Sequence, residues 1–247
     1  MQYPFFNFIT FILLCCAFFT HAQPNPEQWF DTQYSQAIDY CHANSELIES
    51  NLGPCCLPTN MTLAIAFPEM LRYTLWRDIF ETAALELLYV NNGKQAADFS
   101  IGWLQMKPSF AELVENKISG DSLLKNKYSN LVHYTLVNTN AITIRSQRVK
   151  RLKSFAWQLT YLSAFVDLNC EILQKQNIPI NQFITYLSAA YNRGMENSLM
   201  LLTNFSKTKT FPYGPGRKNP FSYCEVAQYF YSHNNLFDGI SQNTNSK

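Results

Sequence analysis

The chain has 247 residues, with 19 Lys and Arg against 18 Asp and Glu and a formal net charge of +1. This balance argues against a nucleic-acid partner, because such partners require a concentrated basic surface. Charged residues make up 15% of the chain and aromatic residues another 15%. That composition suits a sugar-binding groove, but it equally suits an ordinary large core, so composition alone does not decide the function.

The first 22 residues read as a signal peptide. Phe5 to Phe19 is almost wholly apolar yet short for a membrane span, and Thr20-His21-Ala22 offers a small-residue cleavage site. We expect cleavage near Ala22 and a periplasmic or secreted protein. An uncleaved membrane anchor is the alternative, since no Lys or Arg precedes the apolar run. No later segment approaches the roughly 18 uninterrupted apolar residues of a membrane span.

Five cysteines follow the signal: Cys41, Cys55, Cys56, Cys170 and Cys224. Export permits disulfides, and the odd count leaves one thiol over or means that no disulfide framework exists. We expect Cys41 to pair with Cys55 or Cys56, since these cysteines flank one short N-terminal segment. We expect no metal site and no cofactor, because no CxxC pair appears and the four histidines are scattered.

Apolar spacing predicts a mostly helical protein without internal repeats. The predicted helices run from Tyr34 to Asn51, from Thr59 or Asn60 past Met70, from Asp78 to Val90, from Ser109 to Lys117, from Val149 to Gln174, from Pro179 to Gly194, and from Asn219 to Tyr231. Residues 23–33 read as a polar lead-in. Residues 118–147 are weakly patterned, either a lobe insertion or a loop, with one helix or strand near Leu131–Val137. Ser100–Met106 predicts a strand or tight hairpin.

Three details of these helices carry expectations about packing. Pro68 predicts either a kink or the start of a fresh turn, because a proline inside a helix removes a backbone hydrogen bond at a cost of ~3 kcal/mol. Ser109 and Glu112 predict a capping box. The 78–90 helix is the clearest, with a continuous apolar stripe that we expect to be buried. The stripe consists of Ile79, Phe80, Ala83, Ala84, Leu87 and Leu88.

The sequence offers one plausible kind of chemistry, which depends on a carboxylate. No GxSxG, HExxH, Walker A or GxGxxG motif occurs. Glycoside cleavage needs an acid to protonate the leaving oxygen, and a carboxyl in a partly apolar site stays protonated near neutral pH. Glu69, between apolar neighbours that include Phe67 and Leu71, is the candidate. A structural role near a helix start is the alternative interpretation.

Three stretches, in order, resemble motifs of the soluble lytic transglycosylases, bacterial enzymes with a goose-lysozyme-like helical fold. Leu63–Glu69 (LAIAFPE) is similar to their apolar helix ending in the catalytic glutamate. Gly102–Met106 (GWLQM) is similar to their Gly-Leu-Met-Gln turn, and Ala189–Gly194 (AAYNRG) to their Ala-Ala-Tyr-Asn-Ala-Gly motif. The long helix before the third motif and the aromatic helix over Tyr223–Tyr231 also lie where the family has them.

The resemblance implies a mainly α, lysozyme-like (α+β) helical domain with one small β-hairpin beside the active-site cleft. The implied domain organisation is a signal peptide over 1–22, an N-terminal helical extension over 23–58, a lysozyme-like transglycosylase domain over 59–236 and a polar tail over 237–247. The implied partners are peptidoglycan glycan strands, with no nucleic acid, and we expect a monomer.

The implied activity is cleavage of the β-1,4 bond between MurNAc and GlcNAc. Glu69 would act first as acid and then as base, while the C6 hydroxyl of the muramic sugar attacks and gives a 1,6-anhydro product. Gln105 and Asn192 would hydrogen-bond the glycan, and Tyr191 would position the reacting sugar or Glu69. Of the turn residues Gly102 and Trp103, Trp103 either stacks on a sugar or is a core aromatic.

Two departures from the family pattern keep alternatives open. Met70 stands where the family usually has Ser, and Glu69 lies farther from the Gln turn than is usual. Counting back by the usual spacing lands nearer Glu86, so Glu86 and Glu81 are alternative catalytic candidates, although each also reads as a solvated helix-edge carboxylate. The alternative functions are a hydrolytic muramidase and a non-catalytic peptidoglycan-binding or scaffold protein.

Overall fold

Helices dominate the computed structural model, which describes residues 24–76, 82–137 and 140–237. They are α2 (Pro26–Phe30), α3 (Thr32–Ala43), α4 (Ser45–Leu52), α5 (Thr59–Trp76), α6 (Thr82–Asn92), α7 (Pro108–Gly120), α8 (Ser122–Lys127), α9 (Ser129–Val137), α10 (Ala141–Leu152), α11 (Phe155–Lys175), a 3-10 helix (Ile180–Gln182), α12 (Phe183–Arg193), α13 (Leu199–Ser206) and α14 (Tyr223–His233). The mainly α class is therefore confirmed. Within these ranges, β pairing is limited to two isolated bridges, Ile101 with Met106 and Phe211 with Phe221.

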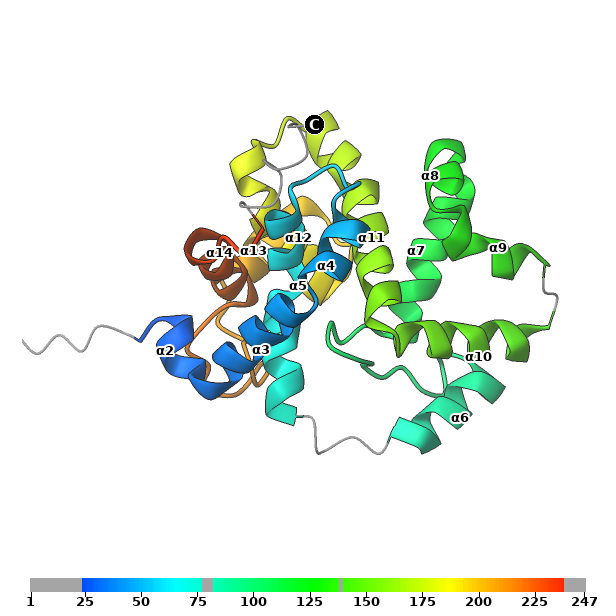
Figure 1. Cartoon of the computed structure of the whole chain (residues 1–247), viewed down its shortest axis with the longest axis horizontal. Coiled ribbons are helices and arrows are strands. Elements are labelled where there is room, and N and C mark those ends of the chain that lie inside the picture. The colour runs from blue at the N-terminus through cyan, green and yellow to red at the C-terminus, as the bar shows by residue number, and fades with distance from the viewer. Residues whose placement is uncertain (1–23, 77–81, 138–139, 238–247) are drawn as a thin grey trace, which may run out of the picture.

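Two groups of helices meet on α11, which is the central helix. Figure 1 shows α6 to α10 on one side of α11, and α3, α4, α5, α12, α13 and α14 on the other. In the second group, α5 packs against α3, α12 and α14, and in the first, α10 packs against α6 and α7. Helix α11 contacts members of both groups. The predicted central helix is confirmed, but it starts at Phe155. Lys153 and Ser154 are not helical and separate α10 from α11.

Helix α5 is buried along most of its length. Every residue from Asn60 to Leu71 is buried, as expected for an apolar run that packs against several helices. The helix runs through Pro68, which excludes a fresh start there, one of the two alternatives that the sequence left open. Burial of this apolar run offsets the ~3 kcal/mol that an internal proline costs.

The N-terminal helices differ from the prediction in two places. The predicted helix over 34–51 is two helices, because Asn44 ends α3 by donating from its side-chain amide to the Tyr40 carbonyl at 2.9 Å. The polar lead-in contains α2, whose N-terminus is closed by a capping box between Asn25 and Gln28. Side-chain hydrogen bonds to the backbone set the end of α3 and the start of α2, and the apolar spacing does not reveal such bonds.

Residues 118–147, where the sequence predicted only one helix or strand near Leu131–Val137, contain α8, α9 and the first part of α10, which belong to the first helix group. Asp121 and Asn140 accept hydrogen bonds from backbone N–H groups and so begin α8 and α10. The predicted capping box at Ser109 does not form. Ser109 instead bonds the Asp98 carboxylate at 2.8 Å, and Glu112 accepts from the Tyr89 hydroxyl at 2.8 Å.

The apolar stripe predicted for the 78–90 helix is largely exposed where the structure describes it. Leu87 is 64% exposed and Leu88 44% exposed, and Ala83 and Ala84 are exposed as well. Ile79, Phe80 and Glu81 lie outside the described residues. Helix α6 instead packs against α10 and buries Tyr89. The prediction of a buried stripe is wrong for the described residues. The face of α6 that turns inward carries Tyr89, whose ring is buried and whose hydroxyl hydrogen-bonds Arg148 and Glu112.

The C-terminal helices follow the prediction more closely. A short 3-10 turn precedes α12, and Gly194 follows its last residue as expected. Helix α13 was not predicted. Helix α14 begins at Tyr223 rather than near Asn219, because Ser222 and Glu225 form a capping box there.

The disulfide joins Cys56 to Cys170 and ties the loop before α5 to α11. Cys41, Cys55 and Cys224 are free thiols, so the predicted pairing of Cys41 is wrong. The Cys41 side chain is buried against α5, where its sulfur lies 3.8 Å from that of Met70. Burial raises the pKa of the Cys41 thiol to about 12 and that of Cys55 and Cys224 to about 11. None of the helices in the described ranges has the length and apolarity needed to cross a bilayer.

Candidate active site

Glu69 is a buried carboxylate on α5, with only 4% of its surface exposed. Arg72, one turn further along the helix, donates from Nη1 to both carboxylate oxygens at 2.9 Å. Asn192, at the end of α12, donates from Nδ2 to Oε1 at 3.0 Å. A buried charge requires such partners. Through Asn192, the fold joins the first and third of the sequence motifs.

The second motif forms a tight turn closed by the Ile101–Met106 bridge, whose two backbone hydrogen bonds measure 3.0 and 3.1 Å. Gly102 and Gln105 both have positive φ, at 66° and 48°. The Gln105 side chain folds back and donates to the Gly102 carbonyl at 2.8 Å. The predicted strand or hairpin is thus reduced to one bridge and a turn.

Gln158 of α11 holds this turn in place, and sequence analysis did not single it out. Its side chain is 1% exposed. The carbonyl oxygen accepts from Leu104 N at 3.0 Å, and the amide nitrogen donates to the carbonyls of Ile101 and Leu152 at 2.5 and 2.8 Å. Gln158 lies among the apolar residues of a core helix, and this pattern could have indicated its role, because a buried polar group has to find hydrogen-bond partners.

Tyr191 of α12 also holds the 102–106 turn in place. Its hydroxyl donates to the Leu104 carbonyl at 2.7 Å, and its ring packs edge-on against Phe110 and Phe165. Burial, and secondarily the nearby Glu69 carboxylate, raise the pKa of Tyr191 well above its usual range. The phenol therefore stays a neutral donor, and it positions the turn rather than hydrogen-bonding Glu69.

One small cavity brings the three motifs together. It has a volume of about 210 Å³ and is lined by Glu69, Arg72, Gln105, Tyr191 and Asn192. Its other lining residues are Ser100, Met106, Lys107 and Phe110. Among the described residues lining this cavity, Glu69 is the sole carboxylate. A second cavity of about 440 Å³ adjoins it and shares Arg72 and Asn192.

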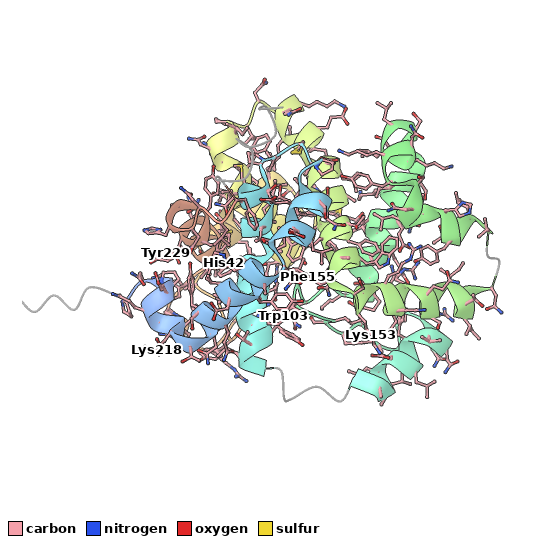
Figure 2. The ribbon with its side chains drawn as sticks, in the orientation of Figure 1. His42, Trp103, Lys153, Phe155, Lys218 and Tyr229 are labelled. Atoms are coloured by element: carbon pink, nitrogen blue, oxygen red, sulfur yellow. A yellow bond between two sulfur atoms is a disulfide. The ribbon has the colours of Figure 1, made fainter. Side chains whose placement is uncertain are left out.

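Glu86, one of the two alternative catalytic candidates, does not line this cavity. Glu86 forms an ion pair with Lys153 at 2.7 Å, beside α6, where Figure 2 labels the lysine. Glu81 lies outside the described residues. Trp103, also labelled in Figure 2, stacks on Tyr40 with ring centroids 3.7 Å apart and interplanar angle 18°. Trp103 is therefore half-buried and packed against the core, and a role in stacking on a sugar stays a prediction.

Tyr223 adds a buried hydroxyl that sequence analysis did not assign to the site. The residue is 1% exposed, and its hydroxyl has no hydrogen-bond partner among the described residues. Burial, with smaller effects from Glu69 and Tyr191, raises its pKa well above the usual range. An unpaired buried hydroxyl costs ~1–3 kcal/mol, which is a sign of a functional neighbourhood.

Replacing Gly102 by Ala should disrupt the turn. The added Cβ would collide with the side-chain amide of Gln158, and a non-glycine residue at this positive φ costs roughly 1–2 kcal/mol by itself. We expect a lower midpoint of thermal unfolding and a weakened site. The matched control is Gly120→Ala, where a Cβ meets nothing within 4 Å. Equal midpoints for the two variants would contradict this account of the turn.

Comparison with known proteins adds no assignment. No protein-family model, curated protein or solved structure matches the chain. The described residues themselves define a mainly helical protein in which the buried Glu69, held by an arginine and an asparagine, lines a small polar cavity.

Proposed function

We propose that this protein is an exported lytic transglycosylase that cleaves peptidoglycan glycan strands, with Glu69 as its single acid and base. The observation that carries the proposal is the convergence of three separated motifs on one cavity. Glu69, Gln105 and Asn192 come from α5, the 102–106 turn and α12, in the order that the soluble lytic transglycosylases have them. We extend the proposal to a lysozyme-like fold, in which the Ile101–Met106 bridge stands for the small β element.

The proposed reaction uses one carboxylate twice. Protonated Glu69 gives its proton to the leaving glycosidic oxygen as the bond to the muramic sugar breaks. The C6 hydroxyl of the same sugar forms the new bond, and Glu69 takes up the proton that this hydroxyl loses. An inverting hydrolase needs a second carboxylate to activate water. Glu69 is the only carboxylate among the described residues that line this cavity, which favours the first route.

Gln105 and Asn192 are proposed to hydrogen-bond the glycan. Asn192 already bonds Glu69 at 3.0 Å, so it can hold the carboxylate and a sugar hydroxyl at neighbouring positions. Arg72 occupies both oxygens of Glu69, and productive glycan binding has to replace part of this ion pair. The same ion pair favours the second candidate function, a binding protein that has lost activity.

Product analysis tests the proposal. Purified protein is incubated with peptidoglycan sacculi, and the released muropeptides are identified by mass spectrometry. We expect 1,6-anhydro-MurNAc ends. Reducing MurNAc ends would replace the proposal with a hydrolytic muramidase. No release, together with retained sacculus binding, would replace it with the non-catalytic binding protein.

A further inference from the structure

The second cavity, which adjoins Glu69, has a lining suited to an anion. Its volume is about 440 Å³, large enough for a small polar group. Two guanidinium groups and several amides and hydroxyls line it, and the described residues of its lining include no Asp or Glu. The polar lining residues are Arg72, Asn192, Arg193, Asn197, Asn204, Thr208 and Thr210.

The chain around this cavity is basic although the protein as a whole is nearly neutral. No acidic residue occurs between Glu196 and Glu225, and four basic residues do. These are the exposed side chains of Lys207, Lys209, Arg217 and Lys218. Since the net charge of the whole chain is only +1, positive charge is concentrated at this side of the site, where it raises the local concentration of anions.

Arg193 has its charge available for a ligand. It is exposed, and its guanidinium carbon lies 5.6 Å from the centroid of the Phe205 ring. It forms no ion pair among the described residues. The nearby Glu196 is turned to Lys117, at 3.9 Å. Arg193 also replaces the alanine of the family motif, so it is a feature of this chain.

We propose that this cavity is a carboxylate-binding subsite in which Arg72 and Arg193 hold an anionic group of the peptidoglycan. The inference rests on the proposed function and names the part of the substrate that this side of the site recognises. Guanidinium groups bind carboxylates through paired, charge-assisted hydrogen bonds. Peptidoglycan carries carboxylates in two places, on the stem peptide and, once the peptide is removed, on the lactyl group of MurNAc.

The shared position of Arg72 links this subsite to Glu69. Arg72 lines both cavities and donates hydrogen bonds from Nη1 to Glu69. A substrate carboxylate bound beside Arg193 competes with Glu69 for the same guanidinium. Binding of the anionic group therefore loosens the ion pair that holds Glu69, which a neutral glycan does not do.

The test compares Arg193→Gln with the wild type on three ligands of equal glycan length: strands with stem peptides, amidase-treated strands with free lactyl carboxylates, and neutral chitooligosaccharides. Kd is measured by calorimetry in a Glu69→Gln background, and KM and kcat in the active protein. We expect Arg193→Gln to raise Kd and KM about tenfold on an anionic ligand, as for loss of one charge-assisted hydrogen bond, with kcat and chitooligosaccharide binding little changed. Arg193→Lys should recover part of the loss. Lys150→Gln, which removes an exposed charge on α10, is the matched control.

The pattern of losses separates the outcomes. A loss on peptide-bearing strands only assigns the subsite to the stem peptide, and a loss on amidase-treated strands assigns it to the lactyl group. Equal effects on all three ligands, or no effect on any, would overturn the inference. If the wild type cleaves nothing, the proposed function fails, while the Kd comparison still decides whether this cavity binds carboxylates.

Discussion

Glu69→Gln should lower the rate of peptidoglycan cleavage by about 10²–10⁴-fold, the usual contribution of a general acid or base. The amide keeps the shape of the side chain and can still accept hydrogen bonds from Arg72 and Asn192, but it has no proton to exchange with the leaving oxygen. Release of muropeptides from sacculi, followed over time, measures the loss. Sacculus binding should persist, because the residues that hold the glycan are unchanged.

The matched control is Glu86→Gln, the same chemical change at a carboxylate that pairs with Lys153 and does not line the cavity. Its activity should be close to that of the wild type. Both variants are compared with the wild type by circular dichroism and thermal unfolding, so that misfolding is detected. An active Glu69→Gln protein, or an inactive but folded Glu86→Gln protein, would remove Glu69 from the catalytic role.

Arg148→Met should destabilise the protein by about 3–5 kcal/mol, the effect of breaking a buried ion pair by removing one partner. Arg148 is 6% exposed and Glu115 2% exposed, and they are joined at 2.6 Å. Glu115 also accepts hydrogen bonds from the hydroxyls of Tyr134 and Tyr161. The variant leaves a carboxylate buried without its counter-charge, at the point where α7, α10 and α11 meet.

Urea unfolding followed by circular dichroism measures this effect as a fall in the midpoint with little change in the slope. Lys150→Met is the control, because Lys150 lies on the same helix and is exposed, and its replacement should change stability by no more than about 0.5 kcal/mol. Similar midpoints for the two variants would show that the buried ion pair is not what holds these helices together.

The helices that sequence analysis placed best are those whose burial follows from their own residues. The apolar run of α5 can avoid water only in the core, and the apolar faces of α11 and α12 predicted that these two helices pack inward. The 78–90 helix shows the limit of this reasoning. Its leucines form a clear stripe, yet α6 buries Tyr89 and leaves Leu87 64% exposed. The Tyr89 hydroxyl finds its hydrogen-bond partners in Arg148 of α10 and Glu112 of α7.

At the candidate site, the predicted residues Glu69, Gln105, Tyr191 and Asn192 line one cavity. The sequence showed the order of these residues along the chain, but not the residues that hydrogen-bond them. Arg72 and Gln158 act through hydrogen bonds to groups that are distant in the sequence or that depend on helix geometry, and Tyr223 matters because of what surrounds its hydroxyl. A single sequence records none of these environments.

Apolar spacing predicted the helical class, and residue chemistry supplied the set of polar residues from which a site can be built, because both are local properties of the chain. Tertiary structure alone decided that Cys56 pairs with Cys170, that Arg72 holds Glu69, and that a basic cavity adjoins the carboxylate. Each of these depends on the distance between atoms brought together by helix packing. Such distances are set by the whole fold and by no single stretch of the chain.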